Sequence, residues 1–172
     1  MTLFLIVAFI IFAAFGLVVF RGAPYVPSHR KDVARAFREL YPLSKKDVLI
    51  DIGSGDGVVL RAAARLGVKK AIGYEINPFL VAISGFISRR SRVVEVRMTD
   101  MWLAKFPDDV TVVYIFMVSR DSKRMAKKLQ TEANRTGQTI AVITYGSELY
   151  GNEPVSAVGA HHLYQIRPLQ AE

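Results

Sequence analysis

The sequence contains no cysteine among its 172 residues. Disulfide bonds and thiolate metal sites are therefore excluded, and the three histidines (His29, His161 and His162) follow no metal-ligand spacing, so we expect no bound metal. His161 and His162 are adjacent, so on a strand they face opposite ways. The first twenty residues also lack any charged side chain. What remains is a chain rich in apolar residues, 51% of the total, which is enough for one domain with a core of its own.

Residues 3–20 form an unbroken apolar run. As a helix this run would span roughly 27 Å, close to the thickness of a bilayer core. A secretory signal peptide would need a positive start and a shorter apolar stretch, and a mitochondrial transit peptide would be rich in arginine, whereas the first arginine here is Arg21. A buried core helix is the remaining alternative. The run predicts a transmembrane anchor at residues 1–21, followed by a juxtamembrane link and helix at 22–46 and a catalytic domain at 47–172.

Positive charge follows the apolar run, and the whole chain carries a net charge of +8. Because positive residues stay on the cytoplasmic side of a membrane, we expect a single-pass protein with its N-terminus outside and its catalytic domain in the cytoplasm. Anionic lipid next to the anchor is a natural partner for this charge. Nucleic acid is the other candidate, but no motif for binding it is present, so we expect none.

Beyond the anchor, apolar periodicity predicts alternating strands and helices. After a helix that begins near Ser28 and ends at Pro42, strands are expected at 47–52, 70–75, 93–98, 111–117 and 139–144. Helices are expected at 57–66, from Asn77 to about residue 88, and at 121–134, and segments 148–152, 156–160 and 163–166 would supply a closing antiparallel hairpin. This order predicts an α/β fold with a mostly parallel sheet and helices on both faces.

The segment VLIDIGSGDG at residues 48–57 carries most of the functional information. It predicts a buried strand, a glycine-rich turn and a helix, and Glu75 follows about twenty residues later, where an acceptor for ribose hydroxyls belongs. The spacing of Gly53, Gly55 and Gly57 differs from the G-x-G-x-x-G of dinucleotide sites. A dinucleotide, or no cofactor at all, stays an alternative.

With the acidic Asp51 before the turn, the segment resembles motif I of the class I, seven-stranded S-adenosylmethionine (SAM) methyltransferases, which have a Rossmann-like fold. An acidic strand end suits the cationic amino group and sulfonium of SAM better than it suits phosphate. The resemblance implies that Asp51, Gly53, Gly55, Gly57 and Glu75 bind SAM. It also implies that Asp100, after the third strand, accepts a hydrogen bond from the adenine amino group, with a helix cap as its alternative role. Asn77 is expected to cap a helix and shape the ribose side of the pocket.

A more specific resemblance comes from four segments in order: PYVPS at 24–28, DIGSGDG at 51–57, GYEINPFLV at 73–81 and DMW at 100–102. The chain resembles the small membrane-anchored protein-lysine methyltransferases that modify the ATP synthase c subunit and the adenine nucleotide translocase. Val58 departs from the family pattern, which has arginine at that position. The absence of a transit peptide points to a prokaryotic relative, whose substrate can differ.

This resemblance implies methyl transfer from SAM to a lysine amine of a membrane protein, near the cytoplasmic surface. Alignment of the amine with the methyl group supplies most of the rate, and a desolvated pocket lowers the lysine pKa so that the amine can attack. Tyr25 is the candidate for the wall of the substrate pocket, with a position at the membrane interface as its alternative. Two competing functions stay open: methylation of a lipid or quinone, and an inactive SAM-binding membrane module.

Overall fold

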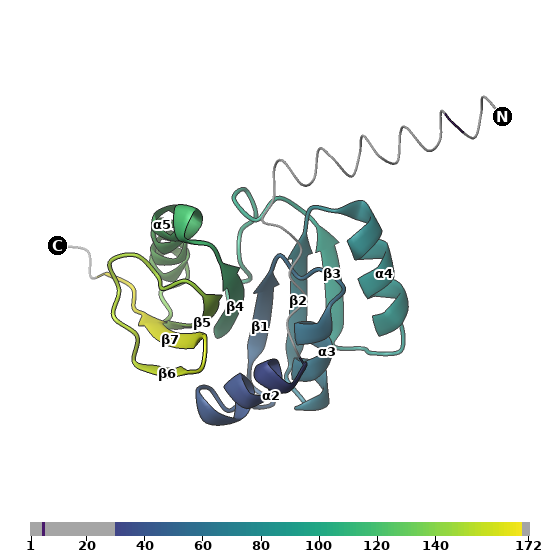
Figure 1. The fold of residues 1–172 in the computed structure, drawn as a ribbon, viewed down its shortest axis with the longest axis horizontal. Helices are drawn as coiled ribbons and strands as arrows, with labels where there is room; N and C mark the ends of the chain where they lie inside the picture. The colour runs from purple at the N-terminus through teal and green to yellow at the C-terminus, as the bar shows by residue number, and fades with distance from the viewer. Residues whose placement is uncertain (1–4, 6–29, 170–172) are drawn as a thin grey trace.

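A computed structural model describes residue 5 and residues 30–169 of the chain. These residues form a seven-stranded sheet in the order β3-β2-β1-β4-β5-β7-β6 (Figure 1). Strands β1 to β5 are parallel, β7 is antiparallel to β5, and β6 is antiparallel to β7. The predicted Rossmann-like fold with a closing antiparallel hairpin is confirmed.

The observed elements follow the predicted alternation closely. The strands are β1 (Val48–Ile52), β2 (Lys70–Glu75), β3 (Val94–Met98), β4 (Val112–Met117), β5 (Ile140–Gly146), β6 (Ser156–Val158) and β7 (His161–Ile166). The helices are α2 (Arg30–Glu39), α3 (Val58–Arg65), α4 (Pro78–Ser88) and α5 (Ser119–Thr136). Strands β1 and β4 are almost fully buried, as expected of central strands covered on both faces.

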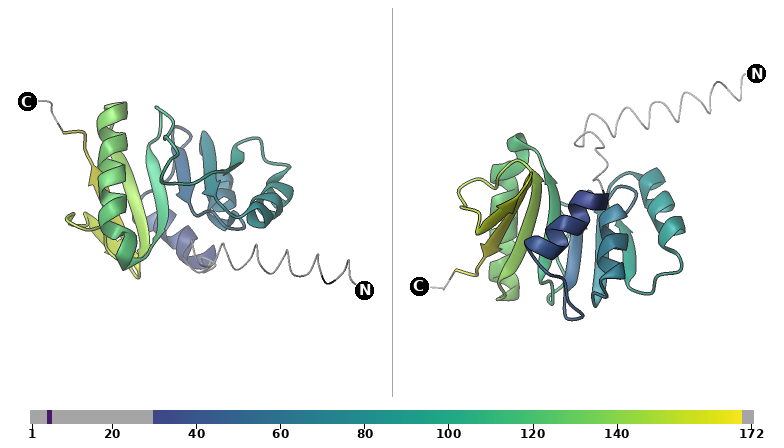
Figure 2. Two further views of the ribbon diagram at one scale, coloured as in Figure 1. Left: turned by 90° about the horizontal axis from the view of Figure 1, so that it is seen from above. Right: turned by 60° about the horizontal axis from the view of Figure 1, so that its bottom comes forward.

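Two apolar clusters hold the sheet between its helices. On one face α2 and α3 pack against the strands, with Val33, Phe37 and Leu60 among the buried side chains. On the other face α5 buries Met125, Leu129 and Ala133, as its apolar spacing predicts, together with residues of β1, β4 and β5. Figure 2 shows α5 beside β4, β5 and β7, and α4 at the opposite end of the molecule, next to β3.

A polar clasp joins the start of β1 to the start of β4. The Asp47 carboxylate accepts hydrogen bonds from the Thr111 hydroxyl at 2.8 Å, the Tyr41 hydroxyl at 3.0 Å and the Ser44 amide at 2.7 Å. Burial alone would raise the pKa of Asp47, but the hydrogen bonds, chiefly those from Ser44 and Thr111, outweigh it and lower that pKa. Burial and the bond to Asp47 raise the pKa of Tyr41 to about 12.

Three details differ from the sequence predictions or lie outside them. Residues 148–152 form a turn rather than part of the hairpin, because Gly151 adopts a left-handed φ of 69° and the Asn152 amide bonds back to the Leu149 carbonyl. Helix α5 begins two residues early, at Ser119, where no side chain caps it. The predicted anchor and the Ser28 cap lie outside the described residues; within those residues, no helix is long and apolar enough to cross a membrane.

Candidate functional site

The glycine turn between β1 and α3 has the backbone conformation that its sequence predicts. Gly53, Gly55 and Gly57 have φ values of 73°, 54° and 80°, in the left-handed region that residues other than glycine rarely adopt. The turn folds over the end of β2, since the Gly53 and Ser54 amides both donate to the Tyr74 carbonyl. A side chain at Gly53 would meet no atom within 4 Å, so the backbone there faces open space that a ligand can approach.

Asp51 lies in β1, immediately before this turn, and only 3% of its surface is exposed. Its Oδ2 atom has no hydrogen-bond partner among the described residues. Burial raises the pKa of Asp51 well above its usual range, and the carboxylates of Glu75 and Asp56 raise it further. An uncompensated buried carboxyl group of this kind favours a cationic or hydrogen-bond-donating ligand.

Glu75 ends β2, and its carboxylate is fixed by three backbone amides. Oε2 accepts from Gly55 at 2.9 Å, while Oε1 accepts from Ile76 at 2.9 Å and from Asn77 at 2.8 Å. Oε2 accepts only one of these three bonds and so retains a lone pair, with which Glu75 can still accept a hydrogen bond from a ligand hydroxyl. Its bond to Gly55 also brings the predicted acceptor directly to the glycine turn.

Asn77 and Asp100 both have local structural roles. The Asn77 side chain caps α4 by accepting from the Phe79 amide at 2.9 Å, which confirms the predicted cap. Asp100 follows β3, and its Oδ1 accepts from the Trp102 amide at 2.8 Å, which shapes the turn after the strand. Asp100 is only half-buried, and a role toward adenine stays a prediction.

Arg61 is a functional candidate that sequence reasoning missed. Its guanidinium donates to the Asp56 carbonyl and lies 3.3 Å from the Asp56 carboxylate, with 12% of its side chain exposed. Arg61 lies almost one helical turn after Val58, the position where the resemblance described above implies arginine. A guanidinium therefore reaches the glycine turn from Arg61 instead, and the three-residue spacing on α3 is the signal that would have shown it.

A groove of about 610 Å³ lies at the carboxyl ends of β4 and β5. Its lining comes from the start of α5 and from the loop after β5: Ser119, Ser122 and residues 147–153. The Ser119 and Ser147 hydroxyls are hydrogen-bonded at 2.8 Å across the groove, and Ser122 ties α5 to the loop through the Glu148 carbonyl at 2.7 Å. The charged lining residues are Glu148 and Glu153, so the lining is acidic in a basic protein, and Lys123 of α5 lies 5.4 Å from the centre of the Tyr150 ring, which also lines the groove.

The glycine turn, Asp51 and Glu75 together fit SAM. The uncompensated Asp51 carboxyl suits a cationic ligand, the backbone at Gly53 is open, and Glu75 can accept from ribose hydroxyls. Phosphate would meet the carboxylates of Asp51, Asp56 and Glu75 instead, which is unfavourable. Among the described residues, no group of three acidic, histidine or cysteine side chains could hold a metal ion.

Comparison with known proteins agrees with this geometry. The family model for the ANTKMT methyltransferase domain matches residues 51–155, from the end of β1 to the start of the closing hairpin. The chain belongs to this family. The predicted relationship to the lysine methyltransferases of the ATP synthase and the translocase is thereby confirmed, and SAM is the cofactor of the family.

Two curated relatives and one solved structure illustrate how this family member compares. It is 38% identical over 121 residues to the lysine N-methyltransferase of the ATP synthase c subunit from Xenopus laevis, covering 69% of this chain and 52% of that protein. It is 28% identical to a protein-lysine N-methyltransferase of Saccharolobus islandicus, covering 78% of this chain and 83% of that protein. The chain spans about half the length of the vertebrate relatives.

The solved structure is an RNA methyltransferase from Salinibacter ruber in complex with S-adenosyl-L-homocysteine. It aligns with a TM-score of 0.75 and 25% identity, covering 86% of this family member and 97% of that chain. That protein, which shares this fold, therefore binds the demethylated form of SAM. Of the residues predicted for the site, only Tyr25 lies outside the described residues.

Proposed function

We propose that this chain is a SAM-dependent methyltransferase that modifies a lysine amine of a membrane-associated protein. The observation that carries the proposal is the arrangement at the carboxyl edge of the sheet. A site fitted to SAM on β1 and β2 lies beside an acidic groove on β4 and β5. The curated relatives named for lysine methylation support the choice of acceptor.

When bound, SAM supplies a methyl group already activated by its sulfonium. The residues of the chain then have two tasks, which are to orient the cofactor and to present a neutral amine. Glu75 fixes the ribose side, and Asp51 offers its free carboxyl oxygen to a cationic group. Glu148 and Glu153 attract a substrate lysine to the open groove as its ammonium, which gives a proton to solvent before transfer. The paired Ser119 and Ser147 hydroxyls can then hold the neutral amine. Alignment at short distance accounts for most of the rate in reactions of this kind.

The proposed location is the cytoplasmic surface of a membrane, with residues 1–21 as a single-pass anchor and the N-terminus outside. The uncharged run at residues 3–20 and the positive charge after it support this proposal. An anchor confines enzyme and substrate to the same surface and so raises their effective concentration. Tyr25, between the run and α2, is the proposed pocket wall.

The experiment combines the full-length, detergent-solubilised chain with methyl-labelled SAM and membranes from its host, with Asp51→Ala as the inactive control. A labelled protein band that yields methyl-lysine on hydrolysis supports the proposal, and its mass identifies the substrate. Label in the lipid fraction would replace it with lipid or quinone methylation. SAM binding without any transfer would instead indicate an inactive binding module.

The acidic lining of the groove supports lysine over nucleic acid as the proposed substrate. Glu148 and Glu153 would repel a polyanion at the lining, which supports lysine over RNA, the substrate class in the name of the Salinibacter ruber protein. The double variant Glu148→Gln, Glu153→Gln should raise KM for the lysine substrate and leave KM for SAM unchanged. Labelling of host RNA rather than protein, with no effect of the double variant, would contradict the assignment.

A further inference from the structure

Helix α4 presents its apolar side to solvent and its polar side to the protein. The large apolar residues on this side are 46–67% exposed: Phe79, Ile83, Phe86 and Ile87 in the helix, and Ile76 just before its cap. The buried positions of the helix are serines, Ser84 and Ser88. A surface helix of a soluble domain normally has the opposite arrangement, with the apolar stripe inward.

The small polar residues on the inner side of α4 are explained by the glycine turn that they face. Ser84 faces Gly57 so closely that a Cβ atom added to the glycine would collide with the serine hydroxyl. Only small residues fit between α4 and the glycine turn, and among the described residues neither Ser84 Oγ nor Ser88 Oγ has a hydrogen-bond partner. The inner side is therefore constrained by the cofactor turn, but this constraint does not require large apolar residues on the outer side.

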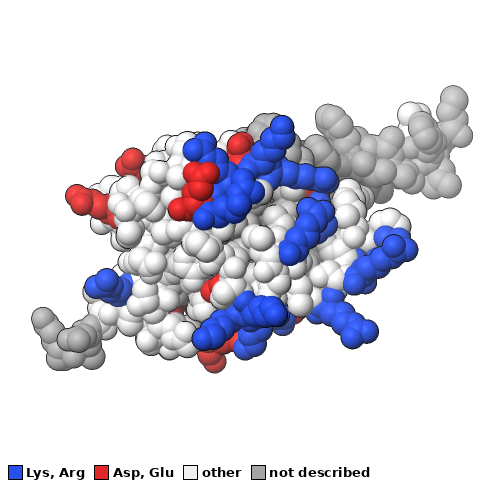
Figure 3. Space-filling view, turned by 90° about the horizontal axis from the view of Figure 1, so that it is seen from below, with Lys and Arg blue, Asp and Glu red and all other residues white. Residues whose placement is uncertain are grey.

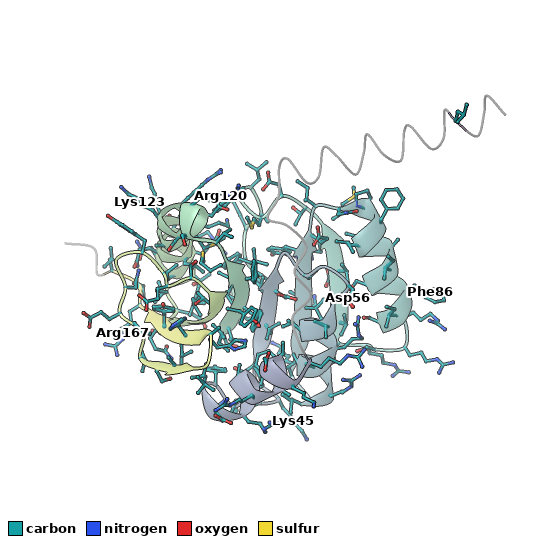
Figure 4. The ribbon with its side chains drawn as sticks, in the orientation of Figure 1. Lys45, Asp56, Phe86, Arg120, Lys123 and Arg167 are labelled. Carbon is teal, nitrogen blue, oxygen red and sulfur yellow. The ribbon has the colours of Figure 1, made fainter. Side chains whose placement is uncertain are left out.

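Positive charge lies at the C-terminal end of the exposed stripe. Arg89, Arg90 and Arg92 are exposed, and the Arg89 guanidinium lies 4.1 Å from the centre of the Phe86 ring. Figure 4 shows Phe86 on the outer side of α4, away from the sheet. Figure 3, seen from below, shows that the charged side chains on the α4 side of this face are basic. Apolar residues flanked by arginine are the pattern of helices that lie in the interface of an anionic bilayer.

We propose that the outer side of α4, together with the flanking residues from Ile76 to Arg92, docks onto an anionic lipid surface. The charge complementarity between the arginines and anionic head groups selects lipid over a second copy of this chain, which has a net charge of +8 and would repel it. Met98, in register with Glu75, adds a 66% exposed apolar side chain at the N-terminal end of the stripe. Docking this side places the cofactor site, which begins at Glu75, next to the membrane surface.

The proposal does not depend on methyl transfer and is tested by fluorescence. Because the chain has no cysteine, a single Ile83→Cys substitution labels one point of the stripe with an environment-sensitive dye. Thr131→Cys, exposed on α5, is the matched control. The full-length chain is reconstituted into vesicles of phosphatidylcholine with or without phosphatidylglycerol, and each dye is challenged with aqueous iodide and with lipid-borne quenchers.

In phosphatidylglycerol vesicles the dye at position 83 should shift to the blue, be shielded from iodide and be quenched by the lipid-borne quencher. The dye at position 131 should stay exposed to iodide. Arg90→Gln should lower the lipid-contacting fraction about fivefold at low salt, whereas Lys127→Gln on α5 should leave it unchanged. Equal iodide access at positions 83 and 131 would overturn the proposal. A blue shift that grows with protein density equally in both kinds of vesicle would replace lipid with a second copy.

Discussion

Replacing Glu75 with glutamine tests the central contact of the site. The carboxylate uses both oxygens toward backbone amides, one toward Gly55 and the other toward Ile76 and Asn77. Glutamine has a single side-chain oxygen, so either orientation of its amide turns an NH₂ group toward a buried backbone N–H. We therefore expect Glu75→Gln to fold with a weakened glycine turn.

The cost follows from the hydrogen bonds that are lost. A hydrogen bond to a charged group contributes about 1.5–3 kcal/mol, and a buried donor left unpaired costs about 1–3 kcal/mol. Relief of the repulsion between Glu75 and Asp51 offsets part of this loss. We expect a net decrease of about 2 kcal/mol in the free energy of unfolding. Loss of a charged acceptor for the ribose diol should weaken SAM binding by about tenfold or more, since tenfold corresponds to about 1.4 kcal/mol.

Urea unfolding followed by circular dichroism gives the stability, and isothermal titration calorimetry gives the SAM affinity. The control is Glu39→Gln, because Glu39 is 44% exposed and pairs only with Arg35 on the surface of α2 among the described residues. That change should cost at most about 0.5 kcal/mol. The reasoning is refuted if Glu75→Gln matches the control in both measurements. Lost stability with unchanged SAM affinity would assign Glu75 a structural role alone.

Three further predictions concern the same site. Because the pKa of Asp51 is raised, its protonated carboxyl contributes fully to the stability of the ligand-free fold below pH 3.8, the ordinary carboxyl pKa, and this stabilisation is lost as the pH rises through the raised pKa. A carboxyl-carbon NMR titration should show that the pKa of Asp51 falls when a cationic SAM analogue binds. Gly57→Ala should destabilise the protein by more than Gly67→Ala in thermal melts, because both have left-handed φ values, at a cost of about 1–2 kcal/mol, but only the first also collides with Ser84. Tyr25→Ala should lower methylation more than SAM binding, and equal turnover would remove Tyr25 from the pocket.

The sheet and the SAM half of the site were predictable because their signals are local. Consecutive residues encode the buried strand, its acidic end and the glycine turn. The parallel arrangement of β1 and β2 then brings Asp51 and Glu75 to the carboxyl edge of the sheet. The cap at Asn77 is equally local, since it depends on residues two and three positions later. The observed positions of these residues match the prediction.

The features that could not be predicted depend on contacts between distant segments. The groove forms because Ser119 and Ser147, far apart in the sequence, meet where β4 and β5 end. The small side chains on the inner side of α4 are required by the close approach of Ser84 to Gly57, a contact between segments that periodicity cannot show. Arg61 was missed because its role depends on a side chain that folds back to Asp56 across a turn of helix.

The Asp47 clasp has a consequence for how the chain folds. Strands β1, β2 and β3 are joined by short helical crossovers and can pair early, whereas β4 must return across 64 residues of sequence to reach Asp47 through Thr111. Closing so long a loop is slow, and contacts between distant segments tend to form late in folding. The Asp47 clasp therefore mainly slows unfolding. It affects the unfolding rate of the enzyme, and so the lifetime of the folded state, more than the folding rate.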